Sequence, residues 1–286
     1  MSSIRMINGG ARAPQVLAIT SGKGGVGKTL TTVNLAMAAR RLGKSVLIFD
    51  GDMGLANVDI VLGLKSRYTI RDVLDGHAAL KDIMIKGPLG VDLIPSGSGI
   101  ASLTRLSHVQ KQQIIEQISQ LDHHYDLILI DTGAGIADSV THFCKAADQT
   151  LVVTTPEPHA MTDAYALIKV LAEDHGVKSL HLLVNQTRSE GEGLKILTRI
   201  ADVAMRFLDV RVHSAGHVPF DPQVTKSVML RRAATEESTH TIAGQAWGQT
   251  ARRLFGGPEA ARSHSDVQEF WRSLLWQQPS RAEGVS

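Results

Sequence analysis

The stretch that decides the fold reads Gly22-Lys23-Gly24-Gly25-Val26-Gly27-Lys28-Thr29. It matches the phosphate-binding pattern G-x-x-x-x-G-K-[S/T] at every fixed position. Glycines allow successive backbone N–H groups to point at one anion, and the helix that follows adds positive potential. In such loops the lysine contacts the β- and γ-phosphates and the hydroxyl residue binds Mg²⁺, so these roles are predicted for Lys28 and Thr29. Residues 22–29 and Leu30 are therefore predicted to bind ATP with Mg²⁺.

The loop carries a second lysine, Lys23, which the phosphate-binding pattern does not require. One interpretation makes it a solvated loop side chain. The other is that Lys23 reaches a nucleotide held by another subunit, so that two copies of the chain share their phosphate sites.

The segments around the loop indicate the fold class. Short apolar runs rich in β-branched residues predict strands at Val16–Thr20, Val46–Asp50, Val91–Pro95, Leu127–Asp131, Leu151–Thr155, His181–Asn185 and Val212–Val218. Most do not alternate polar and apolar residues, which is typical of a parallel sheet buried on both faces. Helical patterns lie between them, directly after the loop and near 107–121, 138–147, 160–175, 190–208 and 223–232. This alternation predicts a doubly wound α/β fold whose mostly parallel sheet is flanked by helices and binds ligands at the carboxyl ends of its strands.

Three acidic residues end two of these predicted strands. Asp131 ends the run that begins at Leu127, where a carboxylate beside a phosphate loop can hold Mg²⁺; a helix cap or turn is the alternative. Asp50 and Asp52 follow the run that begins at Val46, and their spacing puts both on one side of an extended chain. One can then orient the attacking water while the other supports the metal, unless both are solvated turn residues.

The composition bounds the organisation of the chain. With 30 basic and 28 acidic residues among 286, the net charge of +2 argues against a dedicated polyanion binder. A single cysteine, Cys144, excludes an intramolecular disulfide and a multi-cysteine metal cage, and it favours a reducing compartment. No signal peptide and no run of about 18 apolar residues is found, so we expect a cytoplasmic protein. We expect a flexible leader over 1–13, one ATPase domain over 14–255, and a C-terminal segment over 256–286 that contains a linker, an amphipathic helix over 265–277 and a disordered tail.

The nucleotide motifs resemble those of a known family. Residues 23–29 resemble the deviant Walker A loop of the MinD/ParA ATPases, a group of P-loop NTPases of the SIMIBI type. Asp50-Gly51-Asp52 resembles their switch I, and Asp131-Thr132-Gly133-Ala134-Gly135 resembles their Walker B and switch II segment. Four further stretches, at 54–59, 163–169, 207–210 and 218–221, resemble the FlhG/FleN branch, which controls flagellar number. The resemblance spans residues 14–235; Gly51 replaces the alanine usual in the branch, which we expect to loosen this segment.

The resemblance implies roles for single residues. The catalytic residues that it implies are Asp52, Lys23 and Lys28. Lys23 would contact phosphate across a dimer interface, and Asp52 would position the hydrolytic water. Its Mg²⁺ ligands are Thr29, Asp50 and Asp131. Three residues match positions near the adenine base, and a strand-end or turn role is the alternative for each: Asn185, Pro219 and Asp221.

The resemblance also implies a function. MgATP would join two copies into a homodimer, and slow hydrolysis would reset it, which shifts the population between two states. The implied partners are a transcription activator of the FleQ type and the GTPase FlhF, although residues 1–13 contain no match to the FlhF-activating segment of some relatives. The alternatives are a ParA-type DNA-partitioning ATPase, a MinD-type ATPase that positions the cell-division site, and a metabolic P-loop enzyme. No direct contact with nucleic acid is expected, because the charge is balanced.

Five apolar residues near the C-terminus recur at helical spacing: Val267, Phe270, Trp271, Leu274 and Leu275. On a helix they form one apolar stripe, and tryptophan favours the membrane–water interface. We therefore expect ATP-dependent peripheral attachment to the inner face of the cell membrane, strengthened when a dimer carries two such helices. Packing on the protein core and docking on a protein partner are the alternatives.

Overall fold

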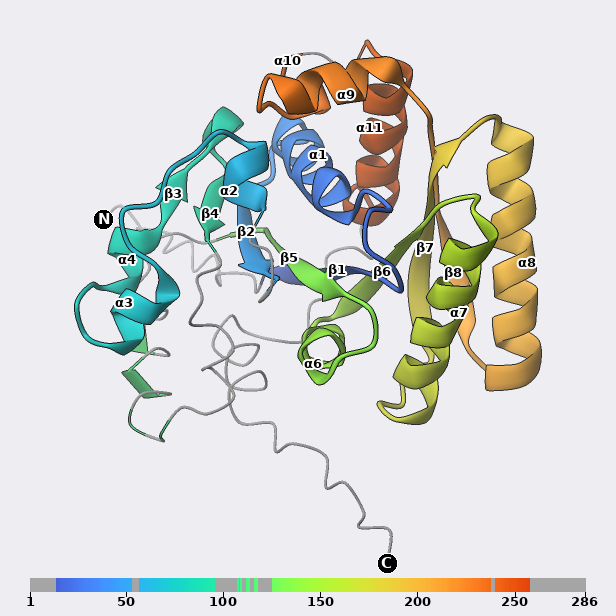
Figure 1. Cartoon of the computed structure of the whole chain (residues 1–286), viewed down its shortest axis with the longest axis horizontal. Helices are drawn as coiled ribbons and strands as arrows, with labels where there is room; N and C mark the ends of the chain where they lie inside the picture. The colour runs from blue at the N-terminus through green and yellow to red at the C-terminus, as the bar shows by residue number, and fades with distance from the viewer. Residues whose placement is uncertain are drawn as a thin grey trace, which may run out of the picture.

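The computed structural model describes residues 14–52, 57–95, 107, 109, 112–113, 116–117, 125–237 and 240–257. Within these ranges the strands form one eight-stranded sheet in the order β3-β4-β2-β5-β1-β6-β7-β8 (Figure 1). The strands are β1 (Gln15–Ser21), β2 (Val46–Gly51), β3 (Ile85–Lys86), β4 (Asp92–Ile94), β5 (Leu127–Ala134), β6 (Gln149–Thr154), β7 (Ser179–Thr187) and β8 (Arg211–Pro219). All seven predicted strands are confirmed. Neighbours are parallel except for β3 and β4, which form a short antiparallel pair; β3 and this pairing were not predicted.

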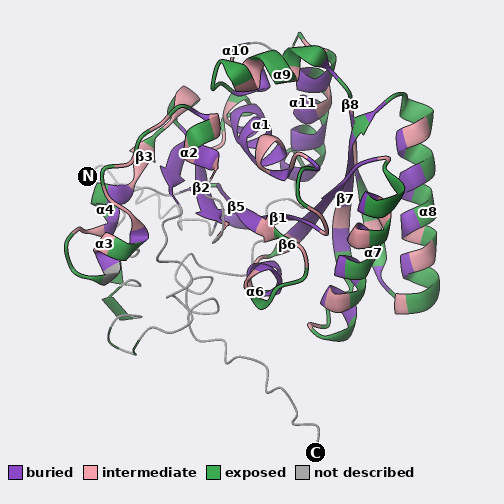
Figure 2. Cartoon of the chain, viewed as in Figure 1, coloured by how far each residue is buried: buried purple, intermediate pink, exposed green. Residues whose placement is uncertain are grey.

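The central strands are buried along their whole length because helices cover both faces. Every residue of β1 and of β2 is buried (Figure 2). Leu17 faces one layer, where it joins a cluster with Val33. Its neighbour Ala18 faces the other layer, where it joins a cluster with Val140 and Leu167. Continuous apolar strands therefore follow from burial on two sides.

The helices form the two covering layers. One layer contains α1 (Lys28–Arg41), α10 (Ala234–Glu237) and α11 (Ile242–Phe255), and the other contains α6 (Asp138–Ala146), α7 (Pro158–Glu173) and α8 (Glu190–Leu208) (Figure 1). The shorter helices are α2 (Val58–Val61), α3 (Ile70–Leu74), α4 (Leu80–Ile83), the 3₁₀ turn η1 (Pro88–Gly90) and α9 (Pro222–Met229). Four predicted helices near 138–147, 160–175, 190–208 and 223–232 are confirmed, as is the helix after the loop. The few described residues of 107–121 include helical ones, such as Val109 and Glu116.

Helix α11 was not predicted, and its sequence explains why. Gly244 and Gly248 lie in its interior, where glycine disfavours a helix by about 1 kcal/mol relative to alanine. Both glycines are buried, and Trp247 between them is 1% exposed in the same hydrophobic cluster as Val33 of α1. Tertiary packing therefore stabilises a helix that local propensity does not indicate.

Two expectations lie outside the described residues. They are the leader over 1–13 and the C-terminal helix with its stripe from Val267 to Leu275. Among the residues that are described, no helix combines the length and the apolar composition needed to cross a membrane.

Candidate functional site

The phosphate loop joins β1 to α1 at the carboxyl edge of the sheet. Gly25 and Gly27 have φ angles of 82° and 87°, a left-handed conformation that favours glycine. The space that a Cβ would occupy at Gly24 and Gly25 is open to at least 4 Å, so this side of the loop can admit a ligand. Gly27 is the N-cap of α1 and offers no side chain, which leaves the first N–H groups of the helix available to an anion.

The loop fits closely against two other elements. A Cβ at Gly22 would lie 2.1 Å from the carbonyl oxygen of Asp163 in α7. Asn185, at the end of β7, donates a hydrogen bond of 2.9 Å from its side chain to the carbonyl of Val26. A Cβ at Gly27 would lie 2.3 Å from the same amide nitrogen. The backbone of the loop is therefore held in place by its contacts with β7 and α7.

Asp131 lies at the centre of the polar cluster beneath the loop. One of its oxygens accepts hydrogen bonds from Lys28 Nζ at 3.1 Å and from Thr32 Oγ1 at 2.9 Å. The other accepts one from Thr29 Oγ1 at 2.7 Å. The structure thus brings the predicted phosphate lysine and two predicted metal ligands into one contact network.

Asp50 lies beside Asp131, because these two residues are register partners in the parallel strands β2 and β5. Its carboxylate is fully buried and accepts backbone N–H groups of Asp52, Asn57 and Val58 at 3.1 to 3.3 Å. Burial, and then the charge of Asp131, raises the pKa of Asp50 to about 7. The neighbouring carboxylate of Asp131 thus raises the proton affinity of Asp50. A bound cation would offset the repulsion between the two negative charges.

The donor set fits Mg²⁺. Carboxylate and hydroxyl oxygens are its preferred protein ligands, and Thr29, Asp50 and Asp131 supply only oxygens. Thr29 Oγ1 and an oxygen of Asp131 already lie within 2.7 Å of each other. These three residues could hold the metal, and the open side of the loop could take the phosphates that share it.

Asp52 and Lys23 lie on the outer side of the site. An Asp52 oxygen lies 3.8 Å from the position of a Cβ at Gly133, so the two predicted switch segments meet there. The ammonium of Lys23 lies 3.2 Å from a carboxylate oxygen of Glu157, the N-cap residue of α7. The side chains of Lys23 and Glu157 are 42% and 68% exposed. This geometry agrees with a solvated loop lysine and also with a lysine that reaches another subunit.

The structure places the other two predicted adenine contacts differently. Asp221 is the N-cap of α9, where one carboxylate oxygen accepts the N–H of Gln223 at 2.9 Å, and the other accepts the N–H of Ala243 at 3.2 Å. Pro219 ends β8 and lines a cavity at the outer edge of the sheet. Asn185 is therefore joined to the loop by a hydrogen bond, whereas Asp221 connects α9 to α11. Contact of these three residues with the base stays a prediction.

Three contributing residues were missed. Thr32 follows Lys28 by one helical turn, and this i, i+4 spacing is a signal that was available. Glu157 gave no local signal, because only the fold brings it to Lys23. Phe143 of α6 was also missed: its ring lies 2.9 Å from where a Cβ would sit at Gly51. Gly51 is buried and regularly paired in β2, so it makes room for this ring, and the expected loosening is not seen in the strand.

Other titratable residues do not build a second metal centre in the described part of the chain. No group of three or more His, Cys, Asp or Glu residues there could hold an ion. Cys144 is buried, and burial raises the pKa of its thiol to about 12, so its side chain packs in the core as a small neutral group.

A glycine-rich loop that opens a helix beside two buried strand-end carboxylates defines a P-loop nucleoside triphosphatase. Comparison with known proteins specifies the class further. Residues 14–180 match the family described as "AAA domain". The chain is 40% identical over 271 residues to the antiactivator FleN of Pseudomonas aeruginosa. The alignment covers 95% of this chain and 96% of the relative. It is 34% identical over 264 residues to the flagellum site-determining protein YlxH of Helicobacter pylori, covering 91% and 89% of the two chains.

Solved structures agree with the sequence comparison. The MinD cell division protein of Aquifex aeolicus superposes with a TM-score of 0.64 at 30% identity, over 85% of this chain and 97% of the other. MinD of Pyrococcus horikoshii, solved with Mg-ADP, has a TM-score of 0.64 at 27% identity, over 84% and 96%. The chain belongs to the MinD/ParA family of P-loop ATPases, in its FlhG/FleN branch.

Proposed function

We propose that this protein is an ATP-controlled switch that limits flagellar number. MgATP joins two copies face to face, the dimer antagonises a transcription activator of the FleQ type and acts with the GTPase FlhF, and slow hydrolysis returns the monomers. The similarity to an antiactivator and to a flagellum site-determining protein supports the flagellar role. One structural observation carries the switch: the Lys23 side chain is 42% exposed beside the open phosphate loop, and its one ion pair among the described residues is an exposed one with Glu157.

The residues of the site divide the chemistry. Lys28 and the loop N–H groups bind the phosphates, while Thr29, Asp50 and Asp131 hold the metal. Bound Mg²⁺ neutralises phosphate charge, which is its usual contribution to phosphoryl transfer. Asp52 orients the water from the switch side. Lys28 is already buried at 7% exposure, so its ammonium needs only to exchange the Asp131 oxygen for a phosphate oxygen.

Lys23 couples the nucleotide to the rest of the protein. In the single chain it pairs with Glu157, at the start of α7. To contact phosphate across a dimer interface, it must leave Glu157. An exposed pair contributes at most about 1 kcal/mol, so this exchange has a low cost. Dimerisation therefore frees the first turn of α7.

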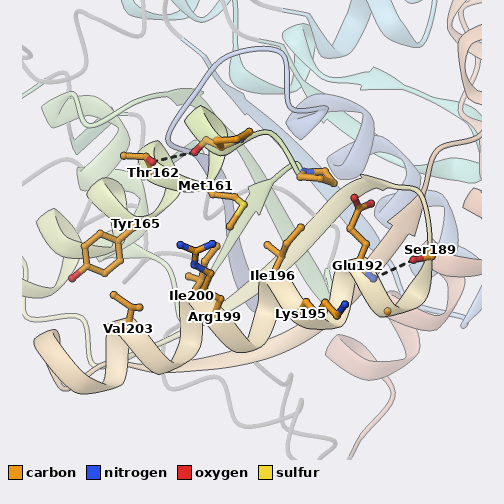
Figure 3. A pocket seen from close by; sticks show the side chains of 13 residues that line it. Met161, Thr162, Tyr165, Ser189, Glu192, Lys195, Ile196, Arg199, Ile200 and Val203 are labelled. Carbon is orange, nitrogen blue, oxygen red and sulfur yellow. Dashed lines mark hydrogen bonds between the residues drawn. The ribbon is translucent and has the colours of Figure 1, made fainter.

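A groove along α7 is the surface that we assign to the transcription activator. It has a volume of about 850 Å³ and lies between α7 and α8 (Figure 3). Met161 and Tyr165 supply apolar and aromatic surface from α7, and Lys195 and Arg199 lie exposed on α8. This combination fits an acidic amphipathic helix. Because Glu157 begins the same helix α7, the groove is linked to the nucleotide state.

Membrane attachment is the second part of the proposal. The stripe from Val267 to Leu275 would bind the inner face of the cytoplasmic membrane weakly as a single helix. A dimer carries two such helices and binds more tightly through effective concentration. The location of the protein would then follow its nucleotide state.

Analytical ultracentrifugation with ATP and Mg²⁺ tests the switch. Wild type should dimerise with ATP and remain monomeric with ADP, and Lys23→Ala should remain monomeric with both. Lys178→Ala is the matched control, since Lys178 is exposed and directly precedes β7, at the opposite edge of the sheet from the phosphate loop. If Lys23→Ala dimerises as well as wild type with ATP, Lys23 does not act across the interface.

A MinD-type role in positioning the division site is the alternative, and the 35% identity over 248 residues to MinD of Synechocystis favours it as the second candidate. Deleting the gene separates the two. Supernumerary flagella with normal septa support the flagellar role, whereas misplaced septa with normal flagellation support the division role.

A further inference from the structure

Among the residues that the structure describes, the outer edge of the sheet is an open strand. β8, from Arg211 to Pro219, pairs with β7 on one side and is the last strand of the sheet. Strand edges present unpaired N–H and C=O groups and can accept another strand. Here α8 and α11 flank the edge, and a cavity of about 500 Å³ lies between them. We call this cavity the β8 edge groove. Its floor includes Ser214, Gly216 and His217 of β8.

An irregularity in β8 shapes the floor of the groove. The β7–β8 register shifts between Leu182 and Leu183, which leaves Ala215 as an extra residue without a partner in β7. The carbonyl of Ala215 accepts a hydrogen bond of 2.6 Å from the guanidinium of Arg253 in α11. Gly216 has a φ of 118°, and a Cβ there would lie 2.6 Å from the same guanidinium. Glycine at this position therefore allows Arg253 to lie against the strand.

Two charged side chains line the groove, and neither has an ion-pair partner among the described residues. Arg253 is exposed and contributes to its α11 wall. Glu190, the first residue of α8, lies near the end of the groove that Pro219 marks, because Thr187 pairs with Pro219 in register. Neither residue makes an ion pair with any described residue. The two walls thus offer one positive and one negative group, on opposite faces of the sheet.

The rims of the groove are apolar. Leu194 of α8 is 61% exposed, and Ile242 of α11 is 55% exposed. Both line the groove, one on each wall. A strand added to β8 would lie between them and remove them from water, which is the arrangement of peptide recognition by strand addition.

We propose that the β8 edge groove binds an extended peptide segment of a protein partner, which adds to β8 as a further strand. The segment carries an acidic side chain toward Arg253 and a basic side chain toward Glu190. Since these groups lie on opposite faces, the two peptide charges are an odd number of residues apart. A second copy of this chain is a poorer occupant, because its own β8 is recessed between the same two helices. The proposal does not depend on the nucleotide or on the flagellar role.

Fluorescence anisotropy of a labelled peptide tests the proposal on the full chain without nucleotide. The probe has the sequence TVKTVETV and blocked ends. One control, TVQTVQTV, lacks the charges, and the other, TVKPPETV, interrupts strand pairing with proline. We expect saturable binding of the first peptide below about 1 mM, binding at least about threefold weaker for the uncharged control, and none for the proline control. Hydrogen exchange of the amides from Arg211 to Pro219 should slow when the first peptide binds.

Variants of the groove complete the test. Glu190→Gln and Arg253→Gln should each weaken binding of the charged peptide at least about threefold, and Lys178→Ala should not. Arg253→Gln could disturb the irregularity in β8, because Arg253 donates to Ala215. Glu190→Gln avoids this problem, since no described hydrogen bond joins the Glu190 side chain to β8. Equal binding of all three peptides, or no binding up to about 1 mM, overturns the proposal. So does nucleotide-free dimerisation that is lost in both variants, because it would identify a second copy as the occupant.

Discussion

The ammonium of Lys28 lies 3.1 Å from a carboxylate oxygen of Asp131, and both side chains are less than 10% exposed. The loop lysine and the metal-site acid therefore neutralise each other inside the site. Their opposite charges offset part of the free-energy cost of burying each group away from water. The ion pair holds the Lys28 ammonium where phosphate would bind and the Asp131 carboxylate where Mg²⁺ would bind.

Replacing Asp131 with asparagine should expose this dependence. The Asp131→Asn change leaves Lys28 as a buried charge without a counterion, which we expect to lower the free energy of unfolding by about 3 kcal/mol. Urea denaturation followed by circular dichroism measures the change, and Mg²⁺-dependent ATP hydrolysis should be lost as well. Asp202→Asn, an exposed change in α8, is the control and should leave both unaltered. Wild-type stability of Asp131→Asn would contradict a structural role for the pair.

Removing the acid that holds Lys23 should favour the dimer. In Glu157→Gln, Lys23 loses the ionic partner that it has among the described residues, so less holds it back from a second subunit. The pair is exposed, and we therefore expect ATP-dependent dimerisation to strengthen by at most about fivefold. Sedimentation equilibrium at several protein concentrations measures this. Glu173→Gln is the matched control, because Glu173 forms an exposed ion pair with Lys169 at the other end of α7. Weaker dimerisation of Glu157→Gln would mean that the pair assists the dimer.

Two glycines of the loop should differ in their tolerance of alanine. Gly27→Ala places a Cβ 2.3 Å from the side chain of Asn185 at a φ of 87°, whereas Gly24→Ala meets nothing within 4 Å. We expect Gly27→Ala to destabilise the nucleotide-free protein by about 1–2 kcal/mol, and Gly24→Ala to have little effect. Thermal unfolding without nucleotide measures both. Equal melting temperatures would show that the Asn185 contact is readily rearranged.

His181 should make stability depend on pH. Burial, and then the charge of His213, lowers the pKa of His181 to about 4, below the value of 6.5 of a free side chain. Between these values the unfolded chain binds more protons, so the free energy of unfolding rises with pH from about 4 to 6.5. His181→Gln should flatten this part of the profile. His159→Gln, on the exposed surface of α7, should leave the slope unchanged. Denaturant titrations at several pH values in this window decide the matter, and an unaltered slope in His181→Gln would refute the assignment.

Removing residues 265–286 should abolish the proposed membrane attachment while preserving ATP hydrolysis. The measurement is co-sedimentation with vesicles that contain anionic lipid, with ATP and with ADP. Replacing Phe270 and Leu274 by serine removes the stripe without shortening the chain and should have the same effect. Unchanged sedimentation of the truncated protein with ATP would end the membrane proposal.

The local sequence was sufficient for the core of the fold and of the site. The phosphate loop could be predicted because its chemistry uses consecutive residues, so the pattern and the geometry coincide. Seven strands could be predicted because burial on both faces requires apolar runs. Asp50 and Asp131 could be placed together because parallel strands bring their carboxyl ends to one edge.

Only the tertiary structure decided the contacts between distant segments. It paired Lys23 with Glu157, fitted the Phe143 ring over Gly51, and formed α11 around Trp247 despite its glycines. It also used Asp221 to connect two helices and left β8 open between α8 and α11. A sequence pattern records what a segment needs from its own neighbours and from burial. Which side chains meet across 100 or more residues depends on how the layers pack, and no local pattern contains that information.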